Sequence, residues 1–380
     1  MKKTLLSILS GCLVTVGFAQ LSGNYTINSA SATGGTNYQT FAAACSALTS
    51  QGVNAPVTFN VLTGNYSNDQ IYFGYGATIS GTNTTNTVTF QSDASNTSNP
   101  EITRASQTLR MYYSNLNNIT FKELDITATS SYPCYIYYGT ATNIRFEDCN
   151  FSNPVGTSGY PLYLYRTTAN NFSMDGCSLD GGYYGAYVYY LGSNSSVEMN
   201  ECEITNWYYR GIYGYYGYYP YVKWTMTNNY IANNPGSYSY PYVGYWYYPA
   251  AGSTFSGNTF DIDGSAGGYG PWIYYAQGSS TNPVTFSNNM INFVDANESG
   301  QQRGMSMYYT KFTNIDHNTV KTSGTGGNYG AYLYYYSGTY NGNTFTNNII
   351  ANPGGNGHNV YYYSYYNAMT NTFTDFDYNA

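Results

Sequence analysis

Apolar residues recur along this chain in short alternating stretches, and one six-residue pattern of apolar and polar positions returns at a nearly constant interval. The pattern is first complete at Phe121–Ile126, with apolar residues at both ends and mostly polar residues between them. Fainter copies begin at Phe59 and Phe90. A constant interval of this size indicates stacked copies of one supersecondary unit. The clear copies, about 25 to 31 residues apart, begin at Phe121, Phe146, Met174, Met199, Met226, Phe255, Phe286, Ile315, Phe345 and Phe373.

A second pattern lies between these copies and consists of one aliphatic residue with a tyrosine on each side. It is clearest at Tyr135–Tyr137 and Tyr187–Tyr189. Both patterns alternate with a period of two, which is typical of strands, and Gly or Asn turns separate them. Most intervals leave no room for an amphipathic helix of ordinary length. The sequence therefore predicts an all-β chain that coils on itself as a parallel β-helix, a solenoid of about twelve coils.

The fourth position of the first pattern changes along the chain from Leu and Cys to Asn. Because neighbouring coils lie about 4.8 Å apart, equivalent residues stack in a column. Stacked Asn side chains can hydrogen-bond along the axis, and Asn tolerates the left-handed backbone of a tight turn. We therefore expect a structural, inward-facing column whose cysteines are small buried apolar residues. Its members are Leu124, Cys149, Cys177, Cys202, Asn229, Asn258, Asn289, Asn318, Asn348 and Phe376.

Residues 1–19 resemble a secretory signal peptide. Lys2 and Lys3 precede an apolar run that ends in small residues, so we place cleavage before Gln20. An alternative is a lipoprotein signal, because the residues that end at Cys12 resemble a lipidation box. Either signal predicts an extracellular or outer cell-surface location. No later segment has the roughly 20 unbroken apolar residues of a membrane helix.

The rest of the chain divides into a cap and a solenoid. Residues 20–55 are expected to form an N-terminal cap with one short helix, which Thr40 begins and Gly52 ends. Such a cap closes the open apolar end of a solenoid. Residues 56–380 are expected to form the β-helix. No comparable device follows them, so we expect the chain to continue beyond Ala380 or to meet a partner there.

The charge and the cysteine content argue against several kinds of partner and site. Only 8% of residues are charged and the formal net charge is −7. Nucleic acids and anionic membrane surfaces both require concentrated Lys and Arg, so we expect neither as a partner. Five cysteines follow the predicted signal, and an odd number cannot complete a disulfide framework. Their spacing fits no zinc motif. They are Cys45, Cys134, Cys149, Cys177 and Cys202.

Several motifs between residues 21 and 102 carry a family resemblance, namely Leu21–Ile27, Asn37–Phe41, Gly52–Val53, Pro56–Val61, Gly64–Tyr66 and Asn86–Ser92. They resemble an N-terminal module of secreted right-handed parallel β-helix proteins, which are surface proteins of Gram-negative bacteria commonly exported by type IX secretion. The resemblance implies a right-handed coil, although the usual C-terminal sorting domain is not visible. The wider pectate-lyase-like superfold contains polysaccharide lyases, hydrolases and non-enzymatic adhesins, so fold alone chooses no activity.

Alternation in the second pattern turns the aliphatic residue to the core and the tyrosines to solvent. A continuous aromatic face exceeds what a monomer normally leaves uncovered, and a ring with a hydroxyl suits sugars. Alternatively, tyrosine merely covers the sheet and stacks with itself. The inward residues are Ile136, Leu164, Val188, Ile273, Met307, Leu333 and Val360. The first exposed column is Tyr137, Tyr165, Tyr189, Tyr274, Tyr308, Tyr334 and Tyr361, and the second is Tyr135, Tyr163, Tyr187, Trp272, Ser306 and Tyr332.

Charged residues offer two further chemistries. Stacked carboxylates can bind calcium or serve as acid and base in glycoside cleavage, although a solvated turn edge needs neither. The basic residues available to a lyase, Arg110, Arg166, Arg210 and Lys223, are scattered along the sequence. His358 follows a glycine-rich stretch with a passing likeness to a calcium-binding repeat. The carboxylates are Glu123, Glu147, Asp148, Asp175, Glu201 and Glu203.

The sequence thus favours a secreted or cell-surface β-helix protein that binds glycans or mediates adhesion through stacked tyrosines. The expected partner is a polysaccharide or a cell-surface glycan. No catalytic residue is assigned and no cofactor is expected, with calcium left open. Two alternatives remain: a polysaccharide lyase or glycoside hydrolase, and a non-binding structural stalk of a larger surface protein.

Overall fold

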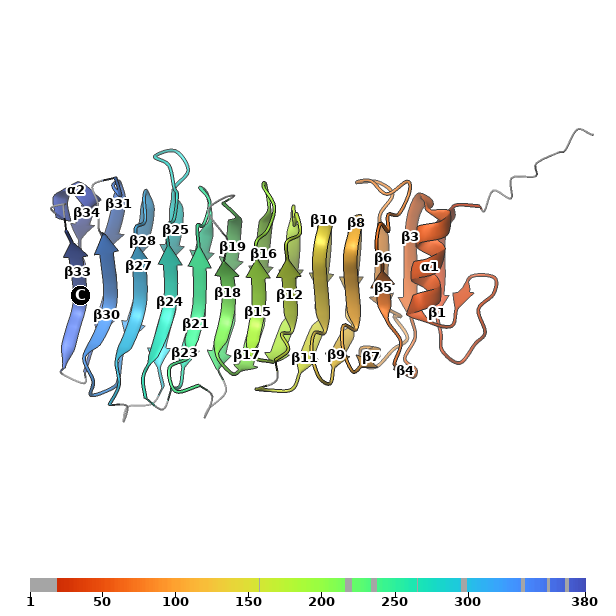
Figure 1. The fold of residues 1–380 in the computed structure, drawn as a ribbon, viewed down its shortest axis with the longest axis horizontal. Helices are drawn as coiled ribbons and strands as arrows, with labels where there is room; N and C mark the ends of the chain where they lie inside the picture. Colours follow the sequence, from red (N-terminus) through yellow and green to blue (C-terminus); the bar gives the residue numbers. More distant parts are fainter. Residues whose placement is uncertain are drawn as a thin grey trace, which may run out of the picture.

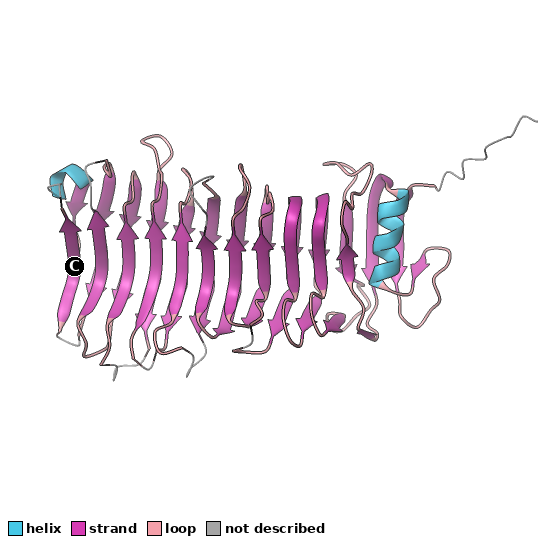
Figure 2. Cartoon of the chain, in the orientation of Figure 1, coloured by secondary structure: helices cyan, strands magenta, loops and turns pink. Residues whose placement is uncertain are grey.

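The computed structural model describes residues 19–156, 158–215, 221–233, 238–264, 266–294, 299–335, 339–353, 356–365 and 369–380. The chain winds into a rod of stacked coils, with helix α1 (Phe41–Gln51) at one end and the short helix α2 (Met369–Thr372) at the other (Figures 1 and 2). Strands of successive coils pair in parallel, which confirms the all-β parallel solenoid of about twelve turns. The predicted signal peptide, up to residue 18, and the alternative lipidation site at Cys12 lie outside the described residues.

Each full coil presents three faces. The first face consists of β5 (Ile71–Phe73), the first halves of β8 (Leu109–Lys122) and β10 (Cys134–Glu147), β12 (Leu162–Tyr165), β15 (Tyr184–Tyr189), β18 (Arg210–Tyr215), β21 (Tyr242–Tyr247), β24 (Gly268–Tyr274), β27 (Gln302–Tyr308), β30 (Asn328–Tyr335) and β33 (Gly357–Ser364). The second face consists of β1 (Leu21–Ile27), β2 (Asn37–Tyr38), β3 (Val53–Val61), β6 (Val88–Ser92), the second halves of β8 and β10, β13 (Phe172–Asp175), β16 (Ser196–Asn200), β19 (Lys223–Thr227), β22 (Thr254–Ser256), β25 (Val284–Ser287), β28 (Thr313–Asp316), β31 (Asn343–Thr346) and β34 (Phe373–Asp377).

The third face is a separate parallel sheet. It consists of β4 (Tyr66–Ser67), β7 (Glu101–Arg104), β9 (Asp125–Ala128), β11 (Asn150–Asn153), β14 (Ser178–Gly181), β17 (Glu203–Trp207), β20 (Tyr230–Asn233), β23 (Thr259–Ile262), β26 (Met290–Phe293), β29 (Thr319–Lys321) and β32 (Ile349–Ala351). The first two faces count as one sheet because β8 and β10 run through the bend between them.

The six-residue pattern is the bend between the second and third faces. Its first residue packs in the core, where the rings of Phe90 and Phe121 stack at 5.4 Å between centroids. Its third residue has a left-handed backbone, as at Asn228 (φ 56°), Gly257 (φ 70°) and Asn288 (φ 54°). Gly and Asn adopt this conformation at lower cost than other residues. The recurring polar positions therefore mark where each coil turns.

A ladder of buried asparagine side chains runs inside this bend. The Oδ1 atom of Asn289 accepts from the backbone N–H and the Nδ2 of Asn258, at 3.0 and 2.9 Å. The Nδ2 of Asn289 donates to the Oδ1 of Asn318 and to the carbonyl of Phe255, at 2.9 and 3.0 Å. Each asparagine side chain thus has its amide oxygen and its amide nitrogen hydrogen-bonded to neighbouring coils, as a buried amide requires. The same bonds link Asn229, Asn258, Asn289, Asn318 and Asn348.

The cysteines of this column have the predicted structural role. Cys149, Cys177 and Cys202 are free and buried, and each thiol lies near a backbone carbonyl of the preceding coil, such as the 3.5 Å from the Sγ of Cys202 to the oxygen of Met174. Burial raises the pKa of the Cys149 thiol well above its ordinary value. Thiols of this kind are unreactive small apolar groups.

Two assignments in the last coil are wrong by a shift in register. Phe376, assigned to the inward column, aligns with Phe345 and is the first residue of its pattern. Asn379 is the rung instead, since its Oδ1 accepts from the Nδ2 of Asn348 at 3.0 Å. Tyr361 aligns with Tyr332 rather than with the first tyrosine column.

This second shift also displaces the neighbours of Tyr361. Val360 aligns with Ala331 and Tyr363 with Tyr334. Both shifts have one cause, since in each segment a residue that resembles the pattern precedes the position that aligns with the coil before. Phe373 lies three residues before Phe376, and Val360 lies two residues before Tyr362, which aligns with Leu333.

The N-terminal helix forms where the sequence predicts it. The Oγ1 of Thr40 accepts from the N–H of Ala43 at 3.1 Å, and Gly52 (φ 69°) ends the helix. Asp69, from a later coil, also accepts from the N–H of Phe41 at 2.7 Å, a cap that sequence analysis missed. Negative charge at a helix N-terminus is stabilising, so this contact ties the cap to the solenoid.

We predict that Asn289→Ala lowers the free energy of unfolding by about 3 kcal/mol, because it leaves buried N–H donors of Asn258 without an acceptor. Urea denaturation followed by circular dichroism measures this. The matched control is Asn292→Ala in the same coil, whose partly buried amide makes only a 3.3 Å hydrogen bond to Asp261, and we expect a loss below about 1 kcal/mol there. Equal losses in the two variants would contradict a stabilising ladder.

Candidate ligand-binding face

The two predicted tyrosine columns lie side by side on the outer side of the first face, which we call the tyrosine face. Ile136, Leu164 and Val188 are buried between the columns, as the alternation requires. The register aligns Tyr137, Tyr165, Tyr189 and Tyr135, Tyr163, Tyr187 in the early coils. It aligns Tyr274, Tyr308, Tyr334 and Trp272, Ser306, Tyr332 in the later ones. The strands that carry them run next to one another along the whole rod (Figure 1).

Both columns have further members that the sequence pattern did not reveal. In the two middle coils the inward position holds Gly214 and Trp246 instead of an aliphatic residue, so the pattern is not recognised there. A Cβ atom on Gly214 would lie 2.7 Å from the ring of Trp224, which fills that space. The alternating tyrosines alone could have revealed these coils. The missed members are Tyr112, Tyr213, Tyr215, Tyr245, Tyr247 and Tyr363.

With these additions, the first column is aromatic in every coil from Tyr112 to Tyr363. Ring centroids of Tyr137 and Tyr165 are 5.1 Å apart at 7°, and those of Tyr165 and Tyr189 are 5.6 Å apart at 3°. Since the rings stack along the rod axis, their flat faces cover one another. The side chains are only partly exposed, and they present ring edges and hydroxyl groups to solvent.

Ser306 is the one predicted member that does not reach the surface. Its side chain is fully buried, and the neighbouring ring of Tyr308 covers the gap. The Tyr308 ring lies 5.3 Å from Trp272 and 5.5 Å from Tyr332, which are the second-column residues on either side. At this coil, the Tyr308 ring of the first column therefore fills the place that an aromatic residue takes elsewhere in the second column.

Further tyrosines extend the aromatic surface around the bend to the second face. Tyr113 and Tyr138 stack at 4.6 Å, and Tyr275 and Tyr309 stack at 4.8 Å. All four have a left-handed backbone, with φ between 50° and 55°. Bulky residues are rare in this region and cost free energy there.

The arginines that looked scattered in the sequence are gathered on this face. Arg110 aligns with Tyr135 in the second column, and Arg210 aligns with Tyr242 on the same face. Arg166 lies on the adjoining bend, where its Nη1 donates to the hydroxyl of Tyr138 at 2.7 Å. Arg303, which sequence analysis did not single out, belongs to the same group. Lys223 lies apart from them, on the second face.

The acidic residues line a different edge, the bend between the second and third faces. Lys122 lies 3.9 Å from carboxylate oxygens of both Glu123 and Glu147, and Asn200 donates to Asp175 at 2.6 Å. Among the described residues, no three His, Cys, Asp or Glu side chains lie close enough to hold a metal ion. Calcium binding at this edge, which the sequence left open, stays a hypothesis. No helix in the described part of the chain could cross a bilayer.

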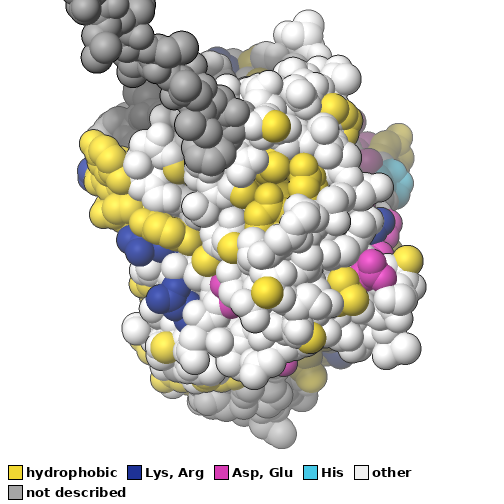
Figure 3. All heavy atoms as spheres, turned by 90° about the vertical axis from the view of Figure 1, so that its right-hand side faces the viewer, with side chains coloured by type: hydrophobic (Ala, Val, Ile, Leu, Met, Phe, Trp, Pro, Cys, Tyr) yellow, Lys and Arg dark blue, Asp and Glu magenta, His cyan; other side chains and the backbone are white. Residues whose placement is uncertain are grey.

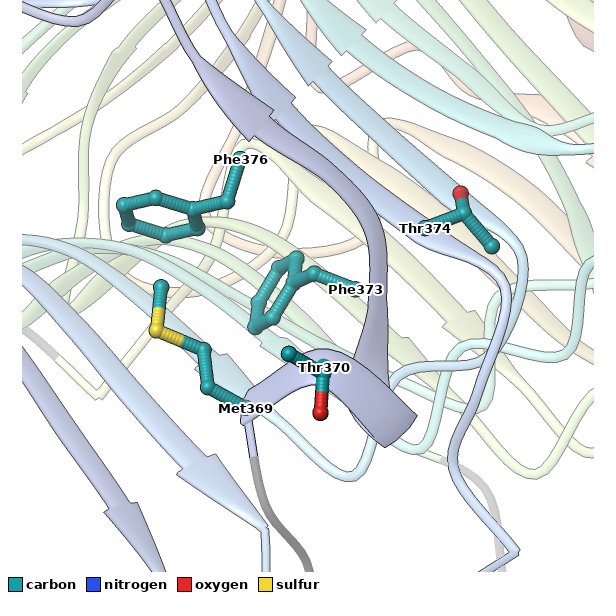
Figure 4. A pocket seen from close by; sticks show the side chains of 5 residues that line it. All are labelled: Met369, Thr370, Phe373, Thr374 and Phe376. Carbon is teal, nitrogen blue, oxygen red and sulfur yellow. The ribbon is translucent and has the colours of Figure 1, made fainter.

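His358 lies on the tyrosine face, aligned with Tyr329, while the glycines before it at positions 354 and 355 lie outside the described residues. In a view onto the N-terminal end, hydrophobic side chains gather along one flank with Lys and Arg beside them (Figure 3). A hollow of about 560 Å³ opens at the other end of the rod, where Met369, Phe373 and Phe376 line the last coil (Figure 4). This hollow is separate from the tyrosine face.

Burial raises the pKa of Tyr160 and Tyr242 to about 12, and it raises the pKa of Tyr163 and Tyr187 as well. The unfolded chain, with tyrosine pKa values near 10, therefore loses protons first as the pH rises. Full stability is present below about pH 10 and is lost above it. We predict that the free energy of unfolding is constant between about pH 7 and 9 and falls steadily above about pH 10.

Phenolate absorbance provides the direct check. The folded protein should show fewer ionised tyrosines at about pH 11 than the same protein in urea. Identical titration curves in the two states would show that the stacked hydroxyls are not shielded from water.

Comparison with known proteins agrees with this architecture. Residues 164–345 match the family described as right handed beta helix region. No curated protein matches the chain. The matched stretch runs from β12 to β31 and includes the asparagine ladder from Asn229 to Asn318. The chain folds as a right-handed parallel β-helix, and its first face carries an aromatic surface.

Proposed function

We propose that the tyrosine face binds polysaccharide, and that the protein acts outside the cell or on its surface as a glycan-binding protein or adhesin. One observation supports this most: the first column is aromatic without interruption from Tyr112 to Tyr363. A continuous aromatic surface of this length is what proteins normally cover.

The second face argues against tyrosine as a mere sheet former. Its equivalent outward positions hold residues such as Thr225, Thr254 and Thr285, which also favour strands. The same coils therefore use threonine on one face and tyrosine on the other. Strand propensity and stacking do not explain this difference, whereas a ligand on one face does.

The stacking also defines what a ligand would meet. Ring faces are covered, so a sugar contacts ring edges and forms hydrogen bonds with hydroxyls. Within one coil, the rings of Tyr163 and Tyr165 are 5.7 Å apart, close to the coil spacing. Two coil steps of about 4.8 Å match the length of a disaccharide unit, so an extended chain can lie along the rod.

Binding is favoured over cleavage by the placement of the carboxylates. Glycosidases use two carboxyl groups on either side of the bond that breaks. In the described strands of the tyrosine face there is no Asp or Glu, and the acidic edge lies on another bend of the coil. The structural stalk remains the outcome if no ligand binds.

We predict that replacing Tyr165, Tyr189 and Tyr334 together by Ala weakens polysaccharide binding at least about tenfold, since the three positions sample the length of the face. The matching Phe variant keeps the stack and removes the hydroxyls, so we expect an intermediate loss. A pull-down with insoluble and soluble polysaccharides measures binding, and the same tubes are assayed for released oligosaccharides.

Tyr230→Ala is the control, because this tyrosine is 38% exposed but lies on the third face. Unchanged binding by the triple Ala variant would sink the proposal. Released products would favour the lyase or hydrolase, and the absence of any bound polysaccharide would favour the stalk.

A further inference from the structure

The tyrosine face is positively charged in a protein of net charge −7. Four of the six arginines, Arg110, Arg166, Arg210 and Arg303, lie on it or at its edge. The described strands of this face contain no Asp or Glu. None of the four arginines forms an ion pair within the described part of the chain. Positive charge is thus concentrated on a face where no carboxylate of the described residues pairs with it.

Arg303 lies in a cage of aromatic rings. Its guanidinium carbon is 4.2 Å from the ring centroid of Tyr332 and 5.6 to 5.8 Å from those of Tyr269, Trp272 and Tyr329. Its Nε donates to Gln301 and its Nη1 to the hydroxyl of Tyr308, at 2.9 and 2.8 Å. A guanidinium has five N–H donors, so the remaining ones are left to an external acceptor.

Arg210 repeats this arrangement in an earlier coil. Its guanidinium carbon lies 4.5 Å from the ring centroid of Tyr213 and 4.9 Å from those of Tyr209 and Tyr242. Its Nε is buried without a hydrogen-bond partner. Arg210 and Arg303 occupy the same column, three coil steps apart, which is about 14 Å at the coil spacing.

Packing does not require arginine at these positions. Tyr242, Tyr269 and Tyr329 fill the same column in neighbouring coils. A tyrosine would therefore complete the stack without the cost of removing a cation from water. Cation–π contact recovers part of that cost, and an anionic ligand would recover more.

We propose that the Arg210 and Arg303 cages are anion-binding sites, and that the ligand of the tyrosine face is an anionic polysaccharide carrying carboxylate or sulfate groups. The planar guanidinium matches both groups through paired hydrogen bonds. The neighbouring hydroxyls hold the sugar on either side of each charge. This inference rests on the proposed function, because it names the class of polysaccharide bound at the same surface.

Two pairs of soluble polymers test it with the full-length protein. Carboxymethyl cellulose and hydroxyethyl cellulose share one backbone and differ in charge, and so do dextran sulfate and dextran. We expect at least about tenfold tighter binding to the charged member of one or both pairs. Binding should weaken as sodium chloride rises from about 50 mM to about 500 mM. The two pairs separate carboxylate from sulfate as the preferred group.

The arginine variants locate the sites. Arg303→Ala and Arg210→Ala should each weaken binding about tenfold. Arg303→Gln, which keeps a planar polar group and removes the charge, should do the same if the effect is electrostatic. The control is Arg145→Ala, because Arg145 is exposed on the second face. Circular dichroism and the urea midpoint confirm that each variant is folded.

Equal binding to both members of each pair would overturn the anion sites and leave the glycan-binding proposal standing. An equal loss in Arg145→Ala and Arg303→Ala would overturn them too, since it would show unspecific attraction. If the protein binds none of the four polymers and no insoluble polysaccharide, the proposed function itself is overturned.

Discussion

The whole structure depends on one constraint, which is that successive coils pair in parallel and lie one inter-strand distance apart. It places equivalent residues about 4.8 Å apart, so each side chain must be compatible with its own kind above and below. Phenylalanine in the core, asparagine at the inner bend and tyrosine on the first face all meet this requirement. Flat rings stack, and amides bond in series along the axis. The alignment of successive coils therefore favours residue types that can stack on copies of themselves.

The same constraint explains why charge is rare, at 8% of residues. Stacked like charges repel, and a cation in an aromatic column must be separated from the next. Arg210 and Arg303 follow this rule, since Tyr242 and Tyr269 lie between them in their column. Each guanidinium replaces a ring and lies close to a neighbouring one, with its carbon 4.5 Å from the ring centroid of Tyr213 for Arg210 and 4.2 Å from that of Tyr332 for Arg303. An arginine is thus the charged side chain that this stack can accept, because it is planar.

The fold could be predicted from the sequence because the period, the alternation and the turn residues all agree. The asparagine ladder from Asn229 to Asn348 follows directly from spacing. The candidate site was predicted only where an aliphatic residue marks the register. Two coils were not recognised because their core positions hold Gly214 and Trp246 instead of an aliphatic residue. Gly214 is small because the ring of Trp224, on another strand, fills the space beside it, and the sequence period does not reveal this contact. The clustering of the arginines was also invisible, since no spacing in sequence relates Arg110, Arg210 and Arg303.

The residues at the bends give a second reason to think that the aromatic surface does more than cover the sheet. Between the second and third faces, asparagine and glycine occupy many of the left-handed positions, as at Asn228 and Gly257. Between the first and second faces, the same backbone conformation is adopted by Tyr138, Tyr275 and Tyr309. Each such residue costs about 1 kcal/mol relative to glycine. A chain rich in glycine could avoid this cost, so retaining tyrosine indicates that the ring itself is needed. Local rules are broken most often at functional sites, so this further column of rings supports the ligand-binding role proposed for the tyrosine face.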